Sequence, residues 1–289
     1  MPQAIAVSRL LVLAAIFATG CTPRESEILP DRSAAVETAQ VVEADLSRFF
    51  GEIQGTFVIL DQQTGRVLRH NARRAQTRFL PASTFKIPNT LIALETGVAT
   101  GPDFTLRWDS TIAPKQEWWP AAWSEDSHSL QTALPNSVVW FYQELARRIG
   151  PDRMTRYLDR FGYGNGDIGG GIDRFWLTGA LRISAEEQLE FLRRFYFGQL
   201  EVDPRSTQIV RELLLLEETR TYRLSGKTGW ADPGGAEPES IGWLIGYVER
   251  GADVHFFAMN IDIRENRDAA ARMTITKEIL QALGLIEES

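Results

Sequence analysis

Patterns typical of β-strands lie near both ends of this chain, and helical patterns fill the region between them. One hairpin pattern spans residues 56–71 and a second spans 241–261, each with strand-forming runs on both sides of a turn. These distant segments must pair with each other to bury their apolar faces. We therefore predict an α+β fold in which about 45–80 and 218–289 form a mainly antiparallel sheet, while about 81–217 forms a helical half packed beside it.

The helical half divides at recognisable start and stop signals. Apolar residues follow helical spacing from Asn136 onward, and Gly150 followed by Pro151 ends one helix and starts the next. Ser184 and Glu187 form a capping box ahead of a third helix. A further helix is predicted over 207–218.

The stretch Pro81–Pro88 holds Ser83 and Lys86, which project from one face of a helical turn. A serine hydroxyl is a weak nucleophile without a base in hydrogen-bond reach, and an ammonium cannot accept a proton. Lys86 has apolar neighbours, and desolvation lowers a lysine pKa. Because proline is tolerated only near a helix start, Pro88 predicts a regular helix from about Lys86, with Ser83 in a tight turn before it. Alone, this spacing favours a solvated helix start with a capping hydroxyl.

Two further stretches favour a catalytic interpretation. Lys227-Thr228-Gly229 follows a strand pattern, and Ser137-Val138-Val139 begins the helix near residue 136. A cleft between the two halves would bring Ser83, Ser137 and Lys227 together, because pockets favour such junctions. The alternatives are a helix N-cap for Ser137 and a solvated strand-end charge for Lys227.

The first residues of the chain have the features of an export signal. Arg9 precedes an apolar run over 10–17, which is short of the about 20 residues that a membrane span needs. We predict an export signal over 1–21, a polar tether over 22–44 and a catalytic domain over 45–289. The expected location is the periplasm.

Cys21 is the single cysteine, so no disulfide can form within the chain. It follows Ala18-Thr19-Gly20, which resembles a bacterial lipoprotein processing site, although such sites usually carry leucine where Ala18 stands. A lipid anchor at Cys21, which would hold the protein at the outer membrane, and ordinary signal cleavage nearby are both consistent with this sequence.

Charge and histidine placement bear on the partners. The net charge of −7 and the absence of a Lys/Arg run argue against nucleic acid. His70, His128 and His255 are scattered without ligand spacing, so we predict no metal site. The sequence leaves the oligomeric state open.

A region without clean periodicity, 101–131, contains four of the eight tryptophans. They are Trp108, Trp118, Trp119 and Trp123. Core filling explains most of them, and one or two could line a pocket.

Together these features resemble the class D serine β-lactamases, the oxacillinases, from Thr56 to Ile286. The stretches that carry the resemblance are, in chain order, 78–86, 137–139, 143–150, 163–165, 175–177 and 227–229. The resemblance implies a serine β-lactamase/penicillin-binding transpeptidase-like fold, with terminal helices flanking the sheet and a helical subdomain. It also implies hydrolysis of the β-lactam amide bond of penicillin-type antibiotics, and thus antibiotic resistance.

The family's catalytic residues fall on specific positions of this chain. By resemblance, Ser83 forms the acyl-enzyme, and the backbone N–H groups of Ser83 and Trp230 make the oxyanion hole. Lys86 is N6-carboxylated by CO₂, which converts it into an anionic general base and requires no other cofactor. Ser137, assisted by Lys227, passes a proton to the β-lactam nitrogen.

Four more residues are assigned in the same way. Trp176 donates to the carbamate and Val139 shields it from water. Thr228 and Arg272 bind the substrate carboxylate, for which a guanidinium offers bidentate geometry. Arg264 and Arg267 are alternatives to Arg272.

The sequence departs from the family at Trp140, where many members have proline, and we expect this tryptophan to repack the helix start. Tyr163-Gly164-Asn165 is expected to shape the cleft. Two rival functions share the motifs: a cell-wall peptidase that deacylates very slowly, and a β-lactam sensor domain that stays acylated.

Overall fold

The computed structural model describes residues 40–231, 240–265 and 268–287. All of them lie in one compact unit, residues 33–289. The expected export signal, Cys21 and the tether up to residue 39 lie outside the described residues. Within the described ranges, no helix combines the length and apolarity needed to cross a bilayer.

The main sheet joins the two ends of the folded region, as the sequence predicts. Its order is β1-β3-β2-β9-β8-β7-β6, and every neighbouring pair is antiparallel except β1 and β3. The strands are β1 (Gln40–Glu43), β2 (Gly55–Asp61), β3 (Arg66–His70), β6 (Leu215–Glu218), β7 (Arg223–Ala231), β8 (Ser240–Arg250) and β9 (Asp253–Ile263). A separate two-stranded ribbon consists of β4 (Thr105–Arg107) and β5 (Ser127–Ser129).

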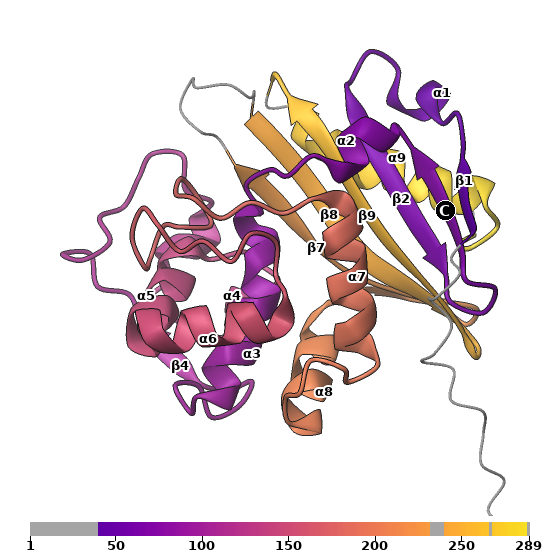
Figure 1. Ribbon diagram of the computed structural model, residues 1–289. Helices are drawn as coiled ribbons and strands as arrows, with labels where there is room; N and C mark the ends of the chain where they lie inside the picture. Colours follow the sequence, from indigo (N-terminus) through magenta and orange to yellow (C-terminus); the bar gives the residue numbers. More distant parts are fainter. Residues whose placement is uncertain (1–39, 232–239, 266–267, 288–289) are drawn as a thin grey trace, which may run out of the picture. The chain divides into compact units, whose positions relative to one another are not determined.

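Helices lie on both faces of this sheet and beside it (Figure 1). The elements are α1 (Ser47–Phe50), α2 (Ala72–Gln76), the 3-10 turn η2 (Ala82–Phe85), α3 (Lys86–Glu95), the 3-10 turn η3 (Ala121–Ser124), α4 (Leu130–Ala133), α5 (Val139–Ile149), α6 (Pro151–Phe161), α7 (Ala185–Tyr196), α8 (Pro204–Leu213) and α9 (Asp268–Ala282). Helices α3 to α6 gather beside the sheet, while α7 and α9 lie on opposite sides of it.

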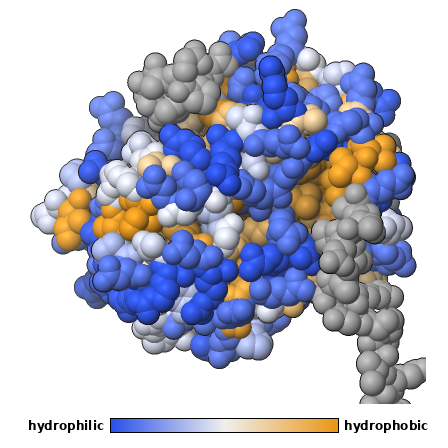
Figure 2. Space-filling view, viewed as in Figure 1, coloured by the Kyte–Doolittle hydropathy of each residue, from blue (hydrophilic) through white to orange (hydrophobic). Residues whose placement is uncertain are grey.

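The alternation of strand side chains creates two separate cores. In β2, Val58 and Leu60 join the core shared with α3, α5 and α7, whereas Phe57 and Ile59 join the core under α9. The outer surface in Figure 2 is mainly hydrophilic, with apolar side chains in separated groups. The sheet is thus buried on both faces, which explains why β8 and β9 read as nearly continuous apolar runs.

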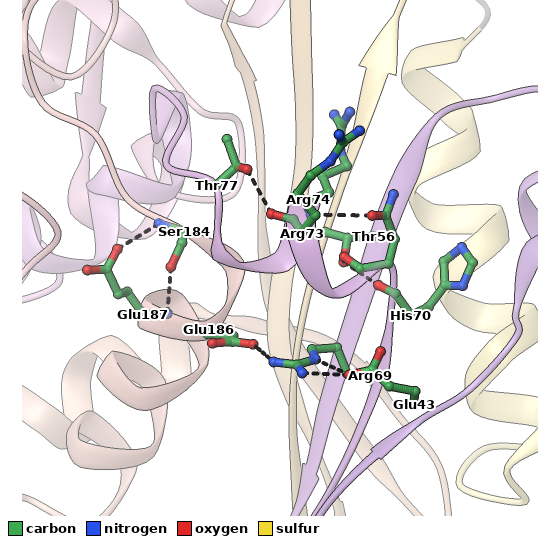
Figure 3. A network of polar contacts seen from close by, with 11 residues as sticks. Glu43, Thr56, Arg69, His70, Arg73, Arg74, Thr77, Ser184, Glu186 and Glu187 are labelled. Atoms are coloured by element: carbon green, nitrogen blue, oxygen red, sulfur yellow. Dashed lines mark hydrogen bonds and ion pairs between the residues drawn. The ribbon is translucent and has the colours of Figure 1, made fainter.

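A polar network ties β1, β3 and α7 together (Figure 3). Arg69 of β3 pairs with Glu43 of β1 and with Glu186 of α7. The predicted capping box is present, because Ser184 accepts from the Glu187 N–H and Glu187 accepts from the Ser184 N–H. These contacts fix the start of α7 against the sheet.

The structure differs from the sequence prediction at three places. Strand β1 lies inside the range assigned to the tether, so the sheet begins at Gln40 rather than near Asp45. The predicted helix over 207–218 ends at Leu213, and Leu215–Glu218 instead pairs with β7 as an edge strand. Ribbon β4–β5 lies in the region that lacks periodicity. In each case a short segment gains its backbone hydrogen bonds from another strand, and the residues of the segment alone do not reveal that pairing.

Arg74 provides a test of how α2 is held to the sheet. Its guanidinium donates to Asn260 at 2.6 Å and to Asp262 at 2.6 Å, with both charged side chains of the ion pair mostly buried. We expect Arg74→Ala to lower the free energy of unfolding by about 3 kcal/mol, because it strands a desolvated carboxylate. The matched control, Arg148→Ala, removes an exposed pair with Glu144 and should cost less than about 1 kcal/mol. Urea unfolding of both variants checks this; equal losses would contradict it.

Candidate active site

Ser83 lies in η2, a tight turn whose backbone is fixed from both sides. The Ala82 N–H donates to the Trp176 carbonyl at 3.0 Å, and the Thr84 N–H donates to the Pro81 carbonyl at 3.2 Å. Ala82 has a φ of 50°, a left-handed conformation that is unusual for a residue with a Cβ. Regular helix α3 begins at Lys86, as Pro88 predicts. The turn therefore presents Ser83, which is half-buried, ahead of the helix rather than within it.

Lys86 is fully buried and its Nζ donates a hydrogen bond to Ser83 Oγ at 2.6 Å. Burial lowers the pKa of this amine well below its ordinary value, and the nearby charge of Lys227 lowers it further. The same Nζ lies 5.3 Å from the ring centroid of Tyr142. The lowered pKa favours the neutral amine, the form that can accept a proton from the neighbouring hydroxyl.

Lys227 of β7 forms a hydrogen bond with the loop before α5. Its Nζ donates to Ser137 Oγ at 3.1 Å, and it is 4% exposed. Burial, followed by the charge of Arg272, lowers the pKa of Lys227 to about 7. The solvated strand-end alternative for Lys227 is therefore wrong.

Ser137 precedes α5 and does not cap it. The N-cap residue is Val138, which makes no side-chain cap hydrogen bond. Ser137 has a φ of 58°, so its backbone is held in a left-handed turn. The N-cap alternative is wrong, and the hydroxyl instead accepts from Lys227.

Gly229 explains how β7 comes so close to the Ser83 turn. A Cβ at this position would lie 3.0 Å from the Pro81 carbonyl oxygen, 3.1 Å from Thr84 Cγ2 and 3.2 Å from Trp243 Cβ. Glycine removes this obstacle. Lys227 and Ser83, which are far apart in the sequence, thereby meet at one site.

Trp176 and Val139 both pack against the core that contains Phe85, the residue before Lys86. The Trp176 ring stacks on Phe85 with centroids 5.2 Å apart, and it is fully buried. Its Nε1 has no hydrogen-bond partner within the described part of the chain. Val139 is half-buried at the first position of α5 and packs against the same core. A buried N–H without an acceptor is rare, which makes Trp176 Nε1 a candidate ligand donor.

The three candidate arginines are placed differently. Arg272 donates to the Gly229 carbonyl and, through Nε, to the Ala269 carbonyl at 2.6 Å. Burial lowers the pKa of Arg272 to about 10. Arg264 is exposed, and Arg267 lies outside the described residues. Arg272 is thus the arginine that contacts the Lys-Thr-Gly strand, where Thr228 is half-buried and Trp230 is 42% exposed.

Trp140 repacks the start of α5 as expected. It is buried, and its indole N–H donates to the Trp123 carbonyl at 2.9 Å. The Trp123 indole in turn donates to the carbonyl of Asn136, next to Ser137, at 2.8 Å. Trp123 is therefore a packing residue, whereas Trp118 is 67% exposed.

Two buried residues that sequence reasoning did not single out support the site. The Lys86 amine lies over the ring of Tyr142. Gln188 donates to Thr84 Oγ1 at 2.8 Å and accepts from Tyr163 at 3.3 Å. Helical spacing does put Tyr142 on the core-facing side of α5, but it cannot say which residue of α3 lies opposite. In the described ranges, no group of three or more metal-ligating side chains occurs.

The charge of Arg272 should have a measurable effect on the pKa of Lys227. Arg272→Met should raise the pKa of Lys227 above its value of about 7, because removing a neighbouring positive charge favours the ammonium. An NMR titration of selectively labelled lysine side chains measures this. Arg148→Met, which removes an exposed arginine of α5, should leave the Lys227 titration unchanged. An unshifted Lys227 in Arg272→Met would show that burial alone sets its pKa.

Comparison with known proteins identifies the family. A family model described as the penicillin binding protein transpeptidase domain matches residues 55–281. β-Lactamase OXA-48 of Klebsiella pneumoniae is 44% identical over 228 residues, covering 79% of this chain and 83% of that protein. The crystal structure of a class D β-lactamase from Nostoc matches with a TM-score of 0.78 at 44% identity, covering 84% of this chain and 99% of that one. Regulatory protein BlaR1 of Bacillus licheniformis is 34% identical over 264 residues, covering 91% of this chain but 41% of BlaR1. The chain therefore belongs to the class D β-lactamases, a family of hydrolases with the penicillin-binding transpeptidase fold.

Proposed function

We propose that this chain hydrolyses the β-lactam amide bond of penicillin-type antibiotics through an acyl-enzyme on Ser83, and so confers antibiotic resistance. The observation that carries the proposal is the 2.6 Å contact between Ser83 Oγ and the buried Lys86 amine. A neutral base within hydrogen-bond reach can take the hydroxyl proton as the oxygen attacks the carbonyl carbon.

The surroundings of Lys86 fit N6-carboxylation by CO₂. Only a neutral amine adds CO₂, and burial keeps the pKa of Lys86 low. The unpartnered Nε1–H of Trp176, in the same aromatic cluster as Phe85, could donate to a carbamate oxygen, and half-buried Val139 limits water access. The carbamate supplies an anionic two-oxygen base, which suits activation of the deacylating water.

The other residues have separate tasks. The backbone N–H groups of Ser83 and Trp230 would hold the developing oxyanion, since β7 packs directly against the Ser83 turn. Ser137, bonded to Lys227, would carry the proton to the β-lactam nitrogen as its bond to the carbonyl carbon breaks. Arg272 and Thr228 would bind the substrate carboxylate.

Removal of the nucleophile tests the proposal directly. Ser83→Ala should lower penicillin turnover by at least about 10⁴-fold, because the hydroxyl that forms the covalent intermediate is gone. Labelling with a fluorescent penicillin and intact-protein mass spectrometry should detect an adduct on the parent protein and none on the variant. An adduct on Ser83→Ala would contradict the assignment.

The carbamate gives a specific pH dependence. Activity should fall as the pH drops through the lowered pKa of Lys86, because the carbamate loses CO₂ on protonation and the resulting ammonium cannot add CO₂ again. Added bicarbonate should restore activity. Initial rates with bicarbonate, against sodium sulfate at equal ionic strength, measure the effect. With ¹³C-bicarbonate, the parent protein should show a carbamate NMR signal that Lys86→Ala lacks. A bicarbonate-insensitive enzyme without this signal would count against the carbamate.

The similarity to BlaR1 keeps a second function in view, a sensor that stays acylated. Steady-state hydrolysis of nitrocefin separates the two, since a sensor gives one turnover and an enzyme gives many. For location, we propose export to the periplasm, either freely soluble or anchored through Cys21. Mass spectrometry of the mature N-terminus distinguishes these two forms.

A further inference from the structure

The aliphatic part of the Arg272 side chain fills space that is free because residue 242 is a glycine. A Cβ at Gly242 would lie 2.8 Å from Arg272 Cδ and 2.6 Å from Ile263 Cδ1. Both distances are shorter than non-bonded contacts of a Cβ atom, so a side chain at this position would displace its neighbours. Gly242 pairs with Trp230 in the β7–β8 register, so the same position sets Arg272 next to Trp230.

The guanidinium of Arg272 is held through two of its three nitrogens. Its NH1 donates to the Gly229 carbonyl and its Nε donates to the Ala269 carbonyl. These bonds use two of the five N–H donors of the group, and the others can bind a carboxylate with two parallel hydrogen bonds. The orientation of the head group therefore decides whether that bidentate edge faces a ligand.

The Trp230 ring lies against this head group and is itself anchored. Arg272 Cζ is 6.0 Å from the ring centroid of Trp230, within the range of a cation–π contact. The indole N–H donates to Ser240 Oγ at 2.6 Å, and Ser240 Oγ donates to the Ala231 carbonyl at 3.0 Å. An exposed tryptophan with no anchor would sample several rotamers, but this one is tied across β7 and β8.

We propose that Trp230, anchored by Ser240, is a positioning residue that orients Arg272 toward the substrate carboxylate, and that it thereby sets the preference for β-lactams with a free carboxylate over their esters. The proposal rests on the proposed function, because it assumes that Arg272 binds that carboxylate. It assigns a role to the Trp230 side chain, which is separate from the backbone N–H of the same residue.

The experiment compares a penicillin with its methyl ester. For each enzyme variant, kcat and KM are measured for both, and the ratio of the two kcat/KM values gives the carboxylate preference. We expect Trp230→Ala to lower this preference about tenfold. The loss should appear mainly as a higher KM for the acid, and the rise in KM should be larger for the acid than for the ester. A merely structural defect would lower kcat/KM for the acid and for the ester by the same factor.

Further variants separate the anchor from the ring. Trp230→Phe keeps the ring but not the N–H, and Ser240→Ala removes the acceptor, so both should lower the preference by less than Trp230→Ala does. Gly242→Ala should also lower the carboxylate preference, because the added Cβ would displace the Arg272 side chain. Ser127→Ala, which removes an exposed hydroxyl in β5, should leave the preference unchanged.

Arg272→Ala, alone and combined with Trp230→Ala, shows whether the tryptophan acts through the arginine. Arg272→Ala should remove most of the carboxylate preference, and adding Trp230→Ala should change the ratio no further. If Arg272→Ala lowers the preference but Trp230→Ala alone does not, the positioning role is wrong while the proposed function stands. If Arg272→Ala leaves the preference intact, the carboxylate assignment fails and the positioning role fails with it. If the parent protein forms no acyl-enzyme, the proposed function itself is wrong.

Discussion

The burial of one lysine amine beside one serine hydroxyl is the constraint on which the site depends. Lys86 is fully buried, and desolvation disfavours its charged form more than any other cause. A buried charge without a counter-ion is costly, so this environment favours the neutral amine. The neighbouring aromatic residues Phe85, Tyr142 and Trp176 maintain that dry environment.

Close backbone packing brings the other groups to this pair. Gly229 lets β7 touch the Ser83 turn, and Gly242 gives the Arg272 stem its place beside the same strand. Both positions are in central strands, where glycine normally weakens a sheet. The local cost is offset by contacts that join segments from both ends of the chain.

Three basic side chains meet at this junction and influence one another. The charge of Arg272 lowers the pKa of Lys227, and the charge of Lys227 lowers the pKa of Lys86. Burial is the larger cause for both lysines. In a chain of net charge −7, the positive charge contributed by Arg272 and Lys227 favours an anionic substrate at the site.

Much of the site could be predicted from local sequence. The proline after Lys86 fixes where the helix starts, the spacing of Ser83 and Lys86 sets their contact, and the Ser184–Glu187 capping box appears as expected. These features depend on residues within one or two helical turns. Family resemblance supplied roles for residues that have no local signature, such as Trp176 and Arg272.

Tertiary structure alone decided which distant residues meet. Strands β1 and β6 exist because they pair with β3 and β7, and Tyr142 lies under Lys86 because α5 packs on α3. The hydroxyl of Ser137 binds Lys227 instead of capping α5, since its left-handed backbone turns it away from the helix. Sequence by itself determined the local turns, the helix starts and the chemical groups available. Long-range packing determined which of those groups are dry, neutral and in contact, because desolvation and proximity arise only when the chain has folded.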